Sequence, residues 1–166
     1  EKLKVGPYTS GNDVDYGPVV TAEAKKNIEK LVQTGIDQGA QLIVDGRNFS
    51  LQGYEDGFFV GPHLFDHATK DMDIYTKEIF GPVLTQVRAK TYEEAISLAM
   101  DHEYGNGTAI FTRDGDTARD FANRINIGMV GINVPIPVPL AYHTFGGWKK
   151  SVFGDLNQHG PDAFKF

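Results

Sequence analysis

The chain has 166 residues, and its 16 Lys and Arg against 22 Asp and Glu give a formal charge of −6 at pH 7. With 40% hydrophobic and 23% charged residues, it has the composition of an ordinary globular protein, and its length predicts a single domain. The acidic balance argues against nucleic acid and anionic membranes as main partners, because both attract basic surfaces. The sequence contains no Cys, which excludes disulfides, thiolate metal sites and a cysteine nucleophile within these residues.

The first half of the sequence predicts a loop, one long helix and several short strands. Residues 8–20 are rich in Gly, Pro, Asn and Asp and are typical of a loop. Thr21 is placed to cap a helix that begins at Ala22, whose apolar residues recur at helical spacing, and Gly39 is placed to end it. The short extended runs that follow are residues 41–45, 58–60 and 63–65.

The second half alternates strands and helices. In chain order it predicts a strand at residues 83–89, a helix at 91–100, a strand at 107–112, a helix that begins near Asp116 and ends before Gly128, and a strand at 129–134. Thr91 and Glu94 form a capping box at the start of the first of these helices. Such alternation implies parallel strands joined by right-handed crossovers. The predicted fold class is therefore α/β, with an open, mostly parallel sheet and helices on both faces.

One acidic stretch raises the question of a metal site. Asp66, His67, Asp71 and Asp73 lie close together in the sequence and offer oxygen and nitrogen ligands. The stretch lacks the ligand spacing of a recognised metal motif. We therefore interpret it as a solvated loop and predict no metal.

A carboxylate and an aromatic ring lie two positions apart at Glu78 and Phe80, just before the turn at Gly81-Pro82. In an extended segment, residues two apart point to the same face. A carboxylate accepts hydrogen bonds from the two hydroxyls of a ribose, and an aromatic ring forms an apolar wall for a flat heterocycle. From the residues alone, a plain turn before an edge strand is the favoured interpretation of this segment.

Three alternate prolines in residues 134–140 exclude a central strand there and make a stiff, extended strap. Gly146-Gly147 follows, between Phe145 and Trp148, where a backbone without side chains can approach a ligand or another segment closely. Composition leaves two interpretations open, a strap that lines a pocket and a strap that packs against its own fold.

These segments together resemble the aldehyde dehydrogenase superfamily. The similar segments, in the superfamily's order, are 15–20 (DYGPVV), 77–84 (KEIFGPVL), 128–133 (GMVGIN) and 144–149 (TFGGWK). Residues 131–139 (GINVPIPVP), with 153–155 (FGD), are more selective and resemble the CoA-acylating methylmalonate-semialdehyde dehydrogenases. Residues 141–147 are similar to the bacterial branch of that group. The resemblance extends over essentially the whole chain.

The resemblance implies a protein about three times longer, of which residues 1–166 are a catalytic-domain portion. An N-terminal NAD-binding domain and the segment with the nucleophilic cysteine, expected shortly before Glu1, would lie outside this chain. This polypeptide alone is then expected to be inactive. The resemblance further implies a cytoplasmic protein that forms a homo-oligomer, a dimer or tetramer, and acts on a small aldehyde.

The implied reaction is covalent. A cysteine thiolate attacks the aldehyde, hydride passes to NAD, and the acyl group loses carbon dioxide and is transferred to coenzyme A as co-substrate. By the same resemblance, Glu78 binds the nicotinamide ribose, Phe80 packs beside the nicotinamide, and Phe145 lines the substrate tunnel. Asn133 lies at a strand end that shapes the site without a chemical step. No catalytic residue and no metal ligand is assigned within the chain.

Two alternatives stay open at this point. The first is an NAD-dependent aldehyde dehydrogenase that releases the free acid, and the second is a non-catalytic binding or assembly module. Lys149 and Lys150 also allow two interpretations: a basic pair that attracts the phosphates of CoA, or solvated surface lysines, which is the favoured one.

Overall fold

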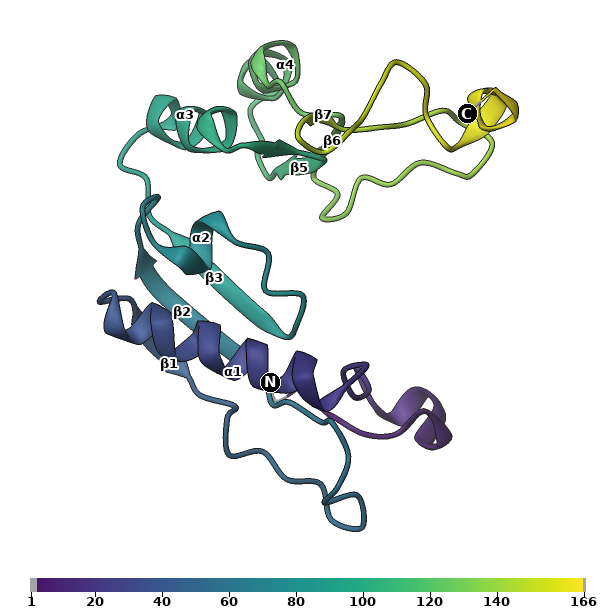
Figure 1. Cartoon of the computed structure of the whole chain (residues 1–166). Coiled ribbons are helices and arrows are strands. Elements are labelled where there is room, and N and C mark those ends of the chain that lie inside the picture. The colour runs from purple at the N-terminus through teal and green to yellow at the C-terminus, as the bar shows by residue number, and fades with distance from the viewer. Residues whose placement is uncertain (1–2, 166) are drawn as a thin grey trace. The chain divides into compact units, whose positions relative to one another are not determined.

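The computed structural model describes residues 3–165, and the chain divides into two compact units, one up to Arg88 and one from Ala89 onward (Figure 1). The elements of the first unit are η1 (Tyr8–Asp13), α1 (Ala22–Asp37), β1 (Gln41–Val44), β2 (His63–Ala68), α2 (Asp73–Thr76) and β3 (Val83–Val87). Those of the second are α3 (Tyr92–Asp101), β4 (Tyr104–Gly105), β5 (Gly107–Ile110), α4 (Gly115–Arg124), β6 (Met129–Ile132), β7 (Trp148–Lys149) and η2 (Gly160–Phe164).

The first unit is a three-stranded sheet packed against α1. The strand order is β1-β2-β3, with β1 antiparallel and β3 parallel to β2. The helix begins where its cap predicts, because Thr21 Oγ1 accepts a hydrogen bond of 3.0 Å from the Ala24 backbone N–H. Ile28 and Val32 on α1 and Phe65 on β2 are almost wholly buried and form the centre of this core. Burial of these side chains fixes the helix on the sheet.

The second unit has the parallel pair β5–β6 and the short antiparallel pair β4–β7. Ile96 of α3 and Phe121 of α4 are buried together with Ile125 and Ile127, so both helices share one core. The N-cap at Thr91 is confirmed, since its Oγ1 accepts a hydrogen bond of 3.2 Å from the Glu94 N–H. The Glu94 carboxylate accepts from the Lys90 N–H at 2.7 Å, and not from the Thr91 N–H as in a full capping box.

The α/β class is confirmed, with parallel pairs β2–β3 and β5–β6. In residues 3–165 the strands are distributed over three sheets, and β1 is antiparallel to its neighbour. Residues 58–60 lie outside any strand. The helix α4 begins near Asp116, as predicted, and its cap is Asp114, whose side chain accepts a hydrogen bond of 2.6 Å from the Thr117 N–H. The last strand ends at Ile132, because Asn133 has a φ of 58° and leaves the extended conformation.

No helix within residues 3–165 combines the length and the apolar character needed to cross a membrane.

Lys149 fastens β7 to the end of α3. Its Nζ donates hydrogen bonds to the backbone carbonyls of Ala99, Met100 and His102, at 3.2, 2.7 and 2.9 Å. These carbonyls belong to the last turn of α3 and the residue that follows it, where a helix leaves acceptors unsatisfied and carries negative partial charge. The neighbouring Lys150 instead pairs with Glu103 through an exposed contact of 2.5 Å.

We expect Lys149→Met to lower the midpoint of thermal unfolding by about 2–6 °C, because three carbonyls lose a charged donor. Lys150→Met is the matched control and should change the midpoint by about 1 °C or less, since it removes an exposed ion pair. Differential scanning calorimetry of both variants checks this. Equal shifts would contradict the anchoring role of Lys149.

His63 is a buried titratable group that lies near the Asp45 carboxylate. Its side chain has no exposed surface, and neither ring nitrogen has a hydrogen-bond partner within the described residues. Burial lowers the pKa of His63, partly opposed by Asp45, whose Oδ1 lies 3.9 Å from Nε2. The unfolded chain therefore binds a proton at His63 at a higher pH than the folded chain does.

Stability should consequently fall as the pH is lowered through the ordinary pKa of histidine, because protons then favour the unfolded state. We expect the free energy of unfolding in urea to decrease between about pH 7.5 and pH 5.5. The decrease should be smaller in His63→Leu, because leucine cannot take up a proton at this position. An unchanged slope in His63→Leu would rule out His63 as the source.

Candidate functional site

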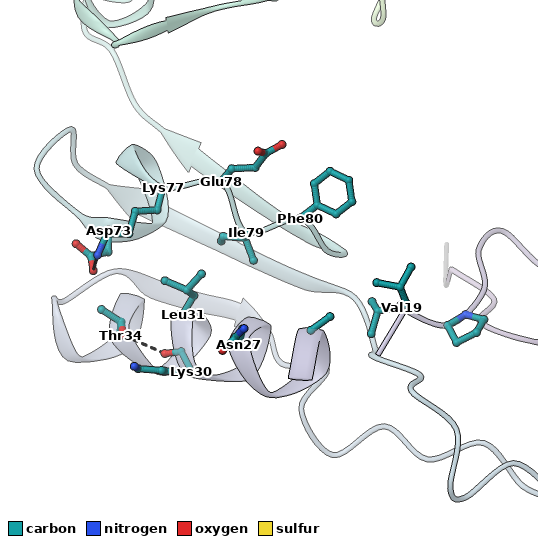
Figure 2. A pocket seen from close by; sticks show the side chains of 13 residues that line it. Val19, Asn27, Lys30, Leu31, Thr34, Asp73, Lys77, Glu78, Ile79 and Phe80 are labelled. Atoms are coloured by element: carbon teal, nitrogen blue, oxygen red, sulfur yellow. Dashed lines mark hydrogen bonds and ion pairs between the residues drawn. The ribbon is translucent and has the colours of Figure 1, made fainter. Parts of the chain in front are cut away.

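Glu78 and Phe80 lie in the segment that joins α2 to β3. Figure 2 shows the Glu78 carboxylate and the Phe80 ring pointing outward from this segment, while Ile79 turns toward α1 and packs on the core. The side chains thus alternate as expected for an extended segment. The Phe80 ring is 81% exposed. A hydrogen-bond acceptor and an aromatic face are therefore presented on one side of the turn.

Packing holds this turn in an unusual conformation. Phe80 has a φ of 52°, in the left-handed region that aromatic residues rarely adopt. The next residue, Gly81, lies directly against α1, because a Cβ there would be 2.5 Å from Ile28 Cδ1. The His63 N–H donates a hydrogen bond of 2.9 Å to the Pro82 carbonyl and ties the end of the turn to β2. Backbone strain of this kind gathers at functional positions.

A pocket of about 810 Å³ lies between α1 and the turn that carries Glu78 and Phe80 (Figure 2). Its volume is typical of a ligand site. The helix contributes the polar residues Asn27, Lys30 and Thr34 to its wall. The sequence analysis missed these residues. They recur three and four positions apart and so share one helix face, but a solvated face has the same pattern.

Among the described charged side chains around this pocket, Lys77 and Asp73 pair with each other, whereas Glu78 has no partner. Lys77 Nζ lies 2.6 Å from Asp73 Oδ2, and this ion pair lowers the pKa of the Asp73 carboxyl. In the part of the chain that the structure describes, the Glu78 carboxylate has no hydrogen-bond or ion-pair partner. It can therefore accept hydrogen bonds from a ligand without first breaking an internal contact.

The acidic stretch around Asp66 is organised by ion pairs. Arg88 contacts the Asp66 carboxylate through two hydrogen bonds of 2.9 and 2.5 Å and lowers its pKa to about 2. Asp73 is paired separately with Lys77. Within residues 3–165, no group of three or more His, Cys, Asp or Glu side chains is placed to hold a metal ion.

Phe145 and Asn133, the other two residues singled out by the sequence, belong to the second unit. Phe145 is half-buried, and its ring is stacked on that of His159. The Asn133 side chain closes the end of the β5–β6 pair, because its Oδ1 accepts from the Thr112 N–H at 2.9 Å and its Nδ2 donates to the Thr112 carbonyl at 3.1 Å.

Two further expectations concern residues near Phe145. The strap exposes its apolar side chains, so packing within its own unit does not cover them; they are Val134, Ile136, Val138 and Leu140. Lys149 and Lys150 are both engaged, the first with three carbonyls and the second with Glu103. These existing contacts argue against the interpretation that the two lysines bind the phosphates of CoA.

The comparisons with known proteins agree with the motifs. The model of the aldehyde dehydrogenase family matches residues 1–166. Malonate-semialdehyde dehydrogenase of Pseudomonas aeruginosa is 56% identical over 164 residues, which are 99% of this chain and 33% of that protein. The acylating, mitochondrial methylmalonate-semialdehyde dehydrogenase of Arabidopsis thaliana is 47% identical over 100% of this chain and 28% of its own length.

A crystal structure assigned to methylmalonate-semialdehyde dehydrogenase of Sinorhizobium meliloti 1021, complexed with NAD, is also similar. It is 69% identical with a TM-score of 0.95, over 98% of this chain and 33% of that one. The chain thus spans about a third of the length of the relatives it matches. Because the family model matches over residues 1–166 and the motifs lie in the same order, the chain belongs to the aldehyde dehydrogenase family.

Proposed function

We propose that residues 1–166 are a catalytic-domain portion of an NAD-dependent, CoA-acylating methylmalonate- or malonate-semialdehyde dehydrogenase. The observation that carries the proposal is the outward pair Glu78 and Phe80, held on a strained turn, in a chain 69% identical to the Sinorhizobium meliloti protein assigned to methylmalonate-semialdehyde dehydrogenase and complexed with NAD. The proposal includes a nucleophilic cysteine and an NAD-binding domain outside these residues. It also includes a homo-oligomeric, cytoplasmic protein that acts on a small aldehyde.

The residues of the turn fit a nicotinamide ribose. The Glu78 carboxylate has free lone pairs for two vicinal hydroxyls, and no partner within the described residues competes for them. The exposed Phe80 ring lies beside it and offers an apolar face for a flat ring. The adjoining pocket has room for a ligand of this kind.

Each residue then has a defined task. NAD, when bound, would accept the hydride of the aldehyde carbon. Glu78 accepts hydrogen bonds from the ribose and so fixes the sugar, and Phe80 limits rotation of the attached ring. Phe145 forms an apolar wall for the aldehyde. The proton and acyl transfers belong to residues that this chain does not contain.

The activity is tested in the full-length protein that includes the cysteine segment. With methylmalonate semialdehyde, NAD and CoA, we expect NADH formation by absorbance and an acyl-CoA thioester by mass spectrometry. A free acid without thioester would favour the water-using alternative. Absence of turnover with NAD bound would overturn the substrate assignment, and failure to bind NAD would favour a non-catalytic module.

We expect Glu78→Gln in the full-length protein to raise the KM for NAD about tenfold, because a neutral amide accepts a weaker hydrogen bond than a carboxylate does. The aldehyde KM should change less. Asp56→Asn removes a charge from an exposed loop in the same unit and serves as the control that leaves both constants unchanged. An unaltered KM for NAD in Glu78→Gln would remove Glu78 from the proposed ribose site.

A further inference from the structure

The ring of Phe145 is held from one side by His159. The two ring centroids are 4.2 Å apart and the planes differ by 8°, so the rings lie face to face. Both residues are half-buried and line the same pocket of about 200 Å³. The described residues give the His159 ring no hydrogen bond or ion pair. The His159 ring therefore contacts Phe145 through its flat face.

The backbone around this stack is fastened at several points. Thr144 Oγ1 donates a hydrogen bond of 3.1 Å to the His159 carbonyl, and the Gly160 N–H donates one of 3.2 Å to the Ala141 carbonyl. Gly146 also packs tightly on Asn157, because a Cβ on Gly146 would lie only 2.0 Å from Asn157 Oδ1. The segment around Phe145 and the segment around His159 thus form one interlocked piece.

We propose that His159 is a positioning residue that fixes the plane of Phe145 and thereby sets the width of the aldehyde site. The proposal rests on the function proposed above, in which Phe145 lines that site. The terminal torsion of a Phe side chain is broad, so the ring plane is poorly defined unless a neighbour restricts it. A parallel ring whose centroid lies 4.2 Å away covers one face of Phe145 and leaves the other face and the edge for substrate.

A second histidine in the same segment provides the matched control. His143 lies near Tyr142, with ring centroids 4.5 Å apart and planes inclined by 48°, and both side chains are exposed. This pair has no ring contact with Phe145 among the described residues. Its removal should therefore leave the aldehyde site unchanged.

The test uses steady-state kinetics of the full-length enzyme with methylmalonate semialdehyde. His159→Ala is expected to raise the aldehyde KM about two- to tenfold, the range of a lost aromatic pair, with the KM for NAD unchanged. His159→Phe keeps a flat ring and should restore the aldehyde KM to within about twofold. His143→Ala should match the wild type.

A double-mutant cycle separates this role from a general structural one. Phe145→Ala should raise the aldehyde KM, and adding His159→Ala should raise it no further, because the ring that His159 positions is gone. A normal aldehyde KM in His159→Ala would overturn the positioning role, and so would a KM in His159→Phe that is raised as much as in His159→Ala. Additive effects of Phe145→Ala and His159→Ala on the aldehyde KM would overturn it as well. These three outcomes leave the proposed function itself untouched. A wild-type enzyme that does not turn over the semialdehyde would overturn the proposed function, and the positioning role with it.

Discussion

The close packing of Gly81 on Ile28 is the contact on which the position of the Glu78–Phe80 turn depends. Ile28 is 1% exposed and lies at the centre of the α1–sheet core, so its position is fixed by the burial of the whole cluster. Because Gly81 has no side chain, the turn can rest directly on this residue. A side chain at position 81 would clash with Ile28, so either this buried residue or the turn with Glu78 and Phe80 would have to shift. The same packing that stabilises the helix therefore determines where the Glu78 and Phe80 side chains point.

The second unit positions its segment by different means. The segment after Asn133 makes few regular backbone pairs, and side chains replace them. The Asn133 amide pairs with both backbone groups of Thr112, Lys149 satisfies three carbonyls at the end of α3, and His159 lies against the face of Phe145. Each contact joins positions that lie far apart in the sequence. An irregular segment can thus hold a defined conformation without belonging to a sheet.

Local signals allowed prediction of the helices and of the Glu78–Phe80 geometry. The cap at Thr21 and the helical period of α1 involve neighbouring residues, so sequence alone specifies them. Asp114 and Asp116 both suit an N-cap, and only the three-dimensional bond distinguishes them. Sheet membership and the anchoring by Lys149 depend on partners far away in the chain. The pocket wall on α1 was missed because a ligand-facing helix face and a solvated one have the same residue pattern.

Backbone strain is concentrated in the segments that carry the family resemblance. Within residues 3–165, four residues other than Gly have positive φ, and three of them, Phe80, Asn133 and Lys149, lie in segments that carry the family resemblance. Asn133 and Lys149 compensate for the conformational cost with hydrogen bonds of their own side chains. Phe80 does not, since its ring is 81% exposed and its backbone is held by the residues after it. The fold thus maintains a strained residue whose side chain contributes little to its own packing, which is the arrangement expected where a ring serves a ligand and not the core.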